Sequence, residues 1–276
     1  MAEKTLPFWD PEQLDYLFCN GQKYLEQKKL QPETIETYLW HVHQFLQWLD
    51  NKKLDTSNLK LYYNYLLKNY SKIATINLRL VILNSYLKFK KENFQFDLLS
   101  AEKQSIEVLD KAQLKQFLDA PLKKKSLMGL RDKILLELAY CTGLKIGQII
   151  KLTKNNINLE KDLIKLDKIE APISATTKFH LLKYLDQRLD ENLYLFINFD
   201  RAKKGNDENN HLSIRSAERI LEKYARTMQP ILKVTPQTLR NTLAYNLKST
   251  GGSAITIQQA LHFTTKTAAE EYFKKI

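Results

Sequence analysis

Arg240 and Tyr272 are the two residues whose types and surroundings best fit a chemical role. Arg240 lies in the run Thr-Pro-Gln-Thr-Leu-Arg-Asn at 235–241, which is typical of the first turns of a helix. Tyr272 lies on another predicted helix near the end of the chain. A guanidinium can hold a phosphate through paired hydrogen bonds, and a phenol can attack it. Together they suggest cleavage of a nucleic-acid strand, although each alone also fits a structural role.

The overall charge points to a polyanionic partner. The 276 residues contain 43 Lys and Arg against 31 Asp and Glu, a net charge of +12, which favours DNA or RNA binding. The two cysteines, Cys19 and Cys141, lie in no cluster that predicts a disulfide framework or a zinc site. No apolar signal-peptide core and no long apolar run occurs, so we expect a cytoplasmic protein that does not span a membrane. The sequence predicts neither a metal nor another cofactor.

Basic residues gather in two parts of the chain. Residues 51–91 hold nine basic side chains against the single acid Asp55. In residues 213–228 the basic residues recur at helical spacing, opposite an apolar stripe, and a further basic tract precedes them. A solvated helix face is the alternative in both places, but we expect DNA contacts. The candidates for these contacts are Lys52, Lys53, Lys72, Arg79, Lys88, Arg201, Lys203, Lys204, Arg215, Arg219 and Lys223.

The periodicity predicts a mainly helical chain of two domains, 1–98 and 109–276. Apolar residues recur every three or four positions in 11–27, 32–51, 57–68 and 73–91, which predicts a four-helix N-terminal bundle. In the second domain the pattern predicts helices over 127–141, 176–189 and 213–228. Residues 156–174 instead read as two or three short strands, so a small antiparallel sheet is expected within a helical domain.

Several motifs together resemble one family. Leu130-Arg131-Asp132-Lys133, the segment from Leu138 to Ile146 (Leu-Ala-Tyr-Cys-Thr-Gly-Leu-Lys-Ile), Thr-Pro-Gln-Thr-Leu-Arg, and the run from Thr256 to Leu261 before Tyr272 occur in order. They are similar to the catalytic domain of tyrosine recombinases of the phage-integrase and Xer type. The N-terminal helices resemble that family's SAM-like core-binding domain. The resemblance covers nearly the whole chain and implies double-stranded DNA as the partner.

The resemblance also implies a metal-free reaction. A tyrosine attacks a DNA phosphodiester, forms a 3′-phosphotyrosyl link and frees a 5′-hydroxyl. Arginines stabilise the charged transition state, and a hairpin lysine protonates the leaving oxygen. Carried over by position, the second arginine matches Arg240 and the nucleophile matches Tyr272. The hairpin lysine best matches Lys168, with Lys165 as its rival.

Three other positions depart from the family. Lys145 stands where the family has an arginine after Thr-Gly-Leu, and Gln237 stands where it has a histidine. Phe263 stands where it has His or Trp, nine residues before the tyrosine. Losing one such donor costs roughly 10²- to 10³-fold in rate, and losing general acid or base catalysis about 10²- to 10⁴-fold. We therefore expect a site that recognises the DNA backbone and cleaves slowly or not at all.

Three hypotheses follow from these residues. The first is a DNA-binding protein in recombination or integration with weak or lost cleavage; the second is an active recombinase that acts through Tyr272. The third is a helical protein-interaction module that has left DNA behind, which the basic tracts disfavour. On DNA the implied partners are further copies of the chain or a partner recombinase. Because relatives carry a longer tail than the four residues after Tyr272, weaker assembly is expected.

Overall fold

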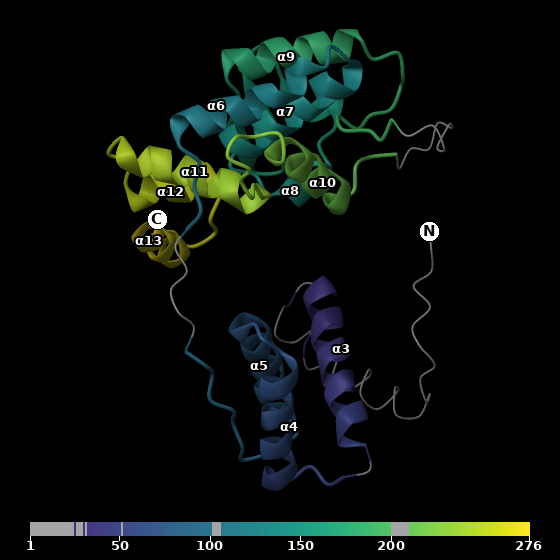
Figure 1. The fold of residues 1–276 in the computed structure, drawn as a ribbon, viewed down its shortest axis with the longest axis vertical. Coiled ribbons are helices and arrows are strands. Elements are labelled where there is room, and N and C mark those ends of the chain that lie inside the picture. The colour runs from purple at the N-terminus through teal and green to yellow at the C-terminus, as the bar shows by residue number, and fades with distance from the viewer. Residues whose placement is uncertain (1–24, 26–29, 31, 51, 101–105, 200–209) are drawn as a thin grey trace. The chain divides into compact units, whose positions relative to one another are not determined.

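The chain forms two compact units, Met1–Lys103 and Gln104–Ile276. The computed structural model describes residues 25, 30, 32–50, 52–100, 106–199 and 210–276. Its elements are mostly helices, with one small sheet in the second unit, which confirms the predicted fold class (Figure 1). Apart from residue 25, the helix predicted over 11–27 lies outside the described residues. So does the basic tract of Arg201, Lys203 and Lys204.

Three helices make up the described part of the first unit. They are α3 (Pro32–Leu49), α4 (Thr56–Asn69) and α5 (Ile73–Phe89), each within two residues of its predicted bounds. Helix α4 begins at Asp55, whose side chain accepts a hydrogen bond from the backbone N–H of Asn58 at 2.8 Å. The three helices enclose one apolar core, in which Phe45, Tyr62 and Leu80 are almost fully buried.

An extended segment follows α5 and is fastened to it by two asparagine side chains. Asn84 exchanges two hydrogen bonds with the backbone of Phe96, at 2.8 and 2.9 Å. Asn77, two turns earlier, does the same with Leu99, at 2.8 Å for both bonds. An asparagine amide has one acceptor and one donor side, so it can pair with a backbone in the way a neighbouring strand would. These four hydrogen bonds hold the extended segment against α5 although it forms no helix or strand.

The second unit is built around helix α7. In chain order, the described helices of this unit are α6 (Lys111–Asp119), η2 (Ala120–Lys123), α7 (Leu127–Cys141), α8 (Ile146–Ile149), η3 (Lys154–Asn156), α9 (Ala175–Asp186), α10 (Ile214–Ala225), α11 (Pro236–Ser249), α12 (Ala254–Leu261) and α13 (Lys266–Lys275). Figure 1 shows α7 between α9 and α10, and it also packs against α6 and α11. No helix in the described part of the chain is long and apolar enough to cross a membrane.

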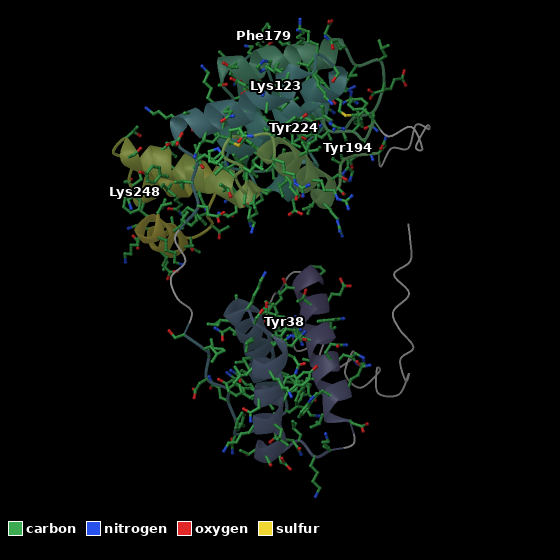
Figure 2. All side chains as sticks on the ribbon, in the orientation of Figure 1. Tyr38, Lys123, Phe179, Tyr194, Tyr224 and Lys248 are labelled. Atoms are coloured by element: carbon green, nitrogen blue, oxygen red, sulfur yellow. The ribbon has the colours of Figure 1, made fainter. Side chains whose placement is uncertain are left out.

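Helix α7 is buried on all sides, including its charged residues. Every residue from Gly129 to Ala139 is buried, so its charges must be paired inside the unit. Asp132 accepts hydrogen bonds from Arg131 at 2.6 Å and from the hydroxyl of Tyr224, labelled in Figure 2, at 2.8 Å. Lys133 pairs with Glu137 at 3.2 Å. The bond from Tyr224 connects α7 to α10, while the other two pair charges within α7 itself.

The small sheet has three antiparallel strands in chain order. They are β1 (Ile157–Asn158), β2 (Leu163–Leu166) and β3 (Ile169–Pro172). Ile164 pairs with Ala171 in the register, and both side chains are buried against the helices. A two-residue turn, Asp167-Lys168, joins β2 to β3, with Asp167 in the left-handed region at φ 52°. A polar Asp tolerates that conformation better than a β-branched residue would.

A glycine allows α7 and α12 to approach closely. Helix α7 ends at Cys141 with Thr142 as its cap, and Gly143 follows with φ 61°, a conformation that favours glycine. A Cβ atom at Gly143 would overlap the carbonyl oxygen of Ala260 in α12. Gly143 therefore serves two purposes, since it ends the helix and leaves room for the backbone of another element.

The paired asparagines predict a selective loosening of the segment after α5. In Asn84→Ala the amide of Phe96 loses its acceptor, and we expect its hydrogen exchange to become about 10-fold faster. The amide of Leu99, held by Asn77, should keep its rate. Asn77→Ala serves as the matched control, with the opposite result. Equal acceleration of both amides in either variant would show that the two pairs do not act separately.

The close approach at Gly143 predicts a large cost for adding one methyl group. Gly143→Ala should lower the free energy of unfolding by about 2–5 kcal/mol, from left-handed strain and overlap with Ala260. Gly251→Ala is the matched control, because Gly251 also has a positive φ, 90°, but open space around it. It should cost about 1–2 kcal/mol, from strain alone. Chemical denaturation measures both, and equal values would remove the steric argument.

Candidate active site

The first turns of α11 carry three side chains of the candidate site. The helix begins at Thr235, whose hydroxyl accepts a hydrogen bond from the N–H of Thr238 at 3.1 Å, with Pro236 in the first turn. Gln237, Arg240 and Asn241 follow three and four residues apart, so they share one face of the helix. The cap and the proline therefore decide where this face begins.

Arg240 is buried and ties α11 to two other segments. Its side chain donates to the carbonyl of Gly143, at the turn after α7, and to the carbonyl of Leu261 at 3.3 Å, at the end of α12. The residue is only 7% exposed, and no carboxylate pairs with it among the described residues. Carbonyl oxygens solvate the cation without neutralising it, so a net positive charge remains at this position.

Tyr272 extends from α13 toward the same face of α11. Its hydroxyl donates to Asn241 Oδ1 and accepts from Gln237 Nε2 at 3.2 Å. The rings of Tyr272 and Phe263 pack with their centroids 5.2 Å apart. Partial burial raises the pKa of the Tyr272 phenol, while the charge of Arg240 and the hydrogen bond from Gln237 lower it. Arg240 and Tyr272 thus lie in one site.

Lysine candidates lie at the surface of the second unit. Lys145 precedes α8, two residues after Gly143, and its side chain is exposed. Lys168 is exposed in the β2–β3 turn, whereas its rival Lys165 pairs with Glu170 at 2.8 Å across the hairpin. In the described part of the chain neither Lys145 nor Lys168 forms an ion pair. Both ammonium groups can therefore reach an anionic ligand, but neither contacts Tyr272 here.

Sequence reasoning missed two residues that shape this site. Asn241 contacts the phenol directly, and its position four residues after Gln237 on a predicted helix was the available signal. His262 ends α12 in the left-handed conformation, with φ 57°, and its Nε2 lies 2.8 Å from the carbonyl oxygen of Thr142. Histidine adopts this conformation more often than most residues other than glycine, so the sequence carries only a weak signal for it.

Helix α10 displays part of its basic stripe to solvent. Arg215 and Arg219 are exposed and line a groove of about 730 Å³ between α10 and residues 231–236. Lys223 is also exposed, but its ammonium lies 3.4 Å from the buried carboxylate of Asp132. One of the three predicted basic residues on this helix is therefore already paired with an acid on α7.

Of the basic candidates in the first unit, four are exposed and one is not. Lys52, Lys53, Lys72 and Lys88 are exposed. Arg79 is only 7% exposed, and its guanidinium lies over the ring of Tyr70, 4.3 Å from the centroid. Its assignment to a phosphate-contacting surface does not fit this position, because aromatic packing keeps the charge inside the helical bundle.

Metal ligands do not gather in the described ranges, where no group of three or more His, Cys, Asp or Glu side chains could hold an ion. Cys141 is a free thiol, and burial raises its pKa to about 12. Such a thiol is protonated and poorly nucleophilic at neutral pH. Of the nucleophiles considered, the phenol of Tyr272 remains the one beside a cation.

Known proteins of similar sequence cover most of this chain. The chain is 25% identical over 265 residues to tyrosine recombinase XerA of Thermococcus kodakarensis, covering 92% of this chain and 88% of that protein. It is 26% identical over 260 residues to XerA of Pyrococcus horikoshii, covering 91% and 86%. The solved Tn1549 transposon integrase, in complex with circular intermediate DNA, shares the fold with a TM-score of 0.68 and 16% identity, covering 91% and 94%.

The family model for the phage integrase family matches residues 107–275. This match spans the second unit from the segment before α6 to the end of α13 and includes Arg240, Gln237 and Tyr272. It agrees with the fold and with the resemblance of the motifs. The chain therefore belongs to the phage integrase family and is a tyrosine recombinase homologue of the Xer-like type.

Proposed function

We propose that this protein binds duplex DNA and that strand cleavage by Tyr272 is strongly attenuated. One observation carries the proposal. Arg240 and Tyr272 come together from α11 and α13, while the neighbours of the phenol are the neutral side chains Gln237, Asn241 and Phe263. Within the described residues the site thus keeps a fixed cation and a nucleophile, and none of the three side chains that contact the phenol can exchange a proton at neutral pH.

Attenuation follows from what these side chains can do. Gln237 can donate a hydrogen bond to a phosphate oxygen, but it cannot accept a proton, and Phe263 can do neither. Lys145 offers charge without the planar fork that grips two phosphate oxygens. Each such change costs between about 10² and 10⁴ in rate, and the costs do not simply add. Recognition of the backbone needs only the positive charge, which remains.

Binding of duplex DNA is supported by the surface charge and by relatives. Arg215 and Arg219 line an exposed groove on α10, and Lys145 and Lys168 are exposed without ion pairs in the described residues. The Tn1549 integrase was solved with circular intermediate DNA, and XerH with its difH substrate before cleavage. Both share this fold, so the same ligand class is the natural proposal for this chain.

Covalent trapping on nicked duplexes of randomised sequence tests the cleavage part. We expect the adduct to form at least about 100-fold faster in the double variant Lys145→Arg/Gln237→His than in the unchanged protein. The double variant regains a planar guanidinium and a group that exchanges protons near neutral pH. Denaturing gels with labelled DNA measure the adduct.

Tyr272→Phe in the same double variant is the control, and it should form no adduct. If the unchanged protein forms the adduct as fast as the double variant, attenuation is wrong and the protein is an active recombinase. If no variant forms an adduct while all bind duplex DNA, the loss of cleavage is complete. If no variant binds duplex DNA even at low salt, the DNA-binding proposal itself fails.

The salt dependence of binding tests the surface on α10. The double variant Arg215→Gln/Arg219→Gln should bind more weakly, and the slope of log affinity against log salt should become shallower by about 2. Each lost phosphate contact releases one fewer counterion, which reduces the slope by about 0.9. Fluorescence anisotropy with labelled duplex DNA over a range of salt concentrations measures it.

Lys178→Gln/Lys183→Gln is the matched control for charge. It removes two positive charges from α9, one of them paired with Asp162 at 2.6 Å, on the other side of α7 from α10 (Figure 1). Its slope should stay close to that of the unchanged protein. Equal changes in both double variants would mean that net charge, and not the groove on α10, governs binding.

A further inference from the structure

The hydrogen bonds around Tyr272 have a single allowed direction. Asn241 Nδ2 donates to the backbone carbonyl of Glu107 at 3.2 Å, and a carbonyl can only accept. The NH₂ side of the amide must therefore face Glu107, and its oxygen must face Tyr272. That oxygen accepts from the Tyr272 hydroxyl and from Gln237 Nε2, the latter at 2.8 Å. One backbone carbonyl thus sets the polarity of the whole network.

This polarity determines where the phenol proton lies. Because Asn241 Oδ1 has no proton, the hydroxyl of Tyr272 must donate to it. The lone pairs of the same hydroxyl then remain for Gln237 Nε2, 3.2 Å away. A phenolate would place its negative charge against the Asn241 oxygen, which cannot turn away without losing its bond to Glu107. The Asn241 amide therefore favours the protonated hydroxyl of Tyr272, whereas the Gln237 amide favours its deprotonated form.

We propose that Asn241 is a positioning residue that holds Tyr272 neutral, with the phenol proton directed at the Asn241 oxygen. Asn241 is 8% exposed and is fixed at both ends of its amide, so it cannot follow the phenol. Its backbone partner Glu107 lies just before α6, and Leu109 is also held to α11, its N–H donating to Thr242 Oγ1 at 3.0 Å. The nucleophile is thus restrained by the segment through which the chain enters the second unit.

The other groups around the phenol do not supply this restraint. Arg240, from α11, is the charged neighbour, and its charge favours the phenolate. Gln237 does the same through its N–H, and Phe263 from the end of α12 presents only a ring. Lys248, labelled in Figure 2, donates instead to the carbonyls of Phe273 and Ile276, at 2.8 and 2.7 Å. Asn241 alone among these groups stabilises the protonated hydroxyl by accepting from it.

Titration of Tyr272 tests this inference on the full chain. Fluorotyrosine labelling and ¹⁹F NMR report each phenol, and Tyr272→Phe assigns the signal. In Asn241→Leu the pKa of Tyr272 should fall by about one pH unit, because an acceptor for the neutral form is lost. In Gln237→Leu it should rise by a similar amount, because a donor to the phenolate is lost. Loosened packing around Tyr272 would not shift its pKa in opposite directions in these two variants.

Asn246→Leu is the matched control, because Asn246 lies on the same helix and its amide donates to another tyrosine hydroxyl, Tyr140, at 3.0 Å. It should leave the pKa of Tyr272 unchanged. Asn241→Ala, with the same expected fall, serves where Asn241→Leu does not fold. An unchanged or higher pKa in the folded Asn241 variant, or an equal fall in Asn246→Leu, overturns the inference. The inference concerns the site of the proposed function, but the titration needs neither DNA nor cleavage, so the two fail independently.

Discussion

A buried, unneutralised guanidinium is the constraint around which the second unit is arranged. Burying a charge without a counter-ion costs several kcal/mol unless fixed dipoles replace water. For Arg240 these dipoles are the carbonyls of Gly143 and Leu261, from segments far apart in the sequence. Their convergence requires α12 to lie against the turn after α7, and only a residue without a Cβ atom fits there. The glycine that ends α7 is therefore part of the charge site.

The charge of Arg240 is also one of two opposing effects on the pKa of Tyr272. Burial favours the neutral phenol of Tyr272, and the nearby cation favours the phenolate. The side chains that touch the hydroxyl, Gln237 and Asn241, are amides that orient a proton without taking it up. The neighbourhood can thus fix the geometry of the phenol, whereas changes in its protonation depend on solvent or on groups that arrive with a ligand.

The sequence predicted the elements of the fold well because their signals are local. Helix α7 has the predicted bounds, since its apolar run ends at a glycine that stops helices. The strands of the sheet lie within the predicted span 156–174, marked by β-branched residues and turn residues. The partners of individual charges were not predictable in this way. Arg79 and Lys223 have the spacing of surface residues, yet Arg79 is buried with its guanidinium over the ring of Tyr70, and the ammonium of the exposed Lys223 lies beside Asp132.

The candidate site was predictable where it repeats family motifs and not where its side chains bond to distant segments of the chain. Arg240 and Tyr272 were found from motifs, but the role of Asn241 depends on a carbonyl more than 130 positions earlier in the chain. His262 is a similar case, since its Nε2 lies 2.8 Å from the carbonyl oxygen of Thr142 across the α7–α12 contact. Both side chains have partners that no local pattern encodes. A motif can therefore locate such a site, but the direction of its hydrogen bonds follows only from the packed structure.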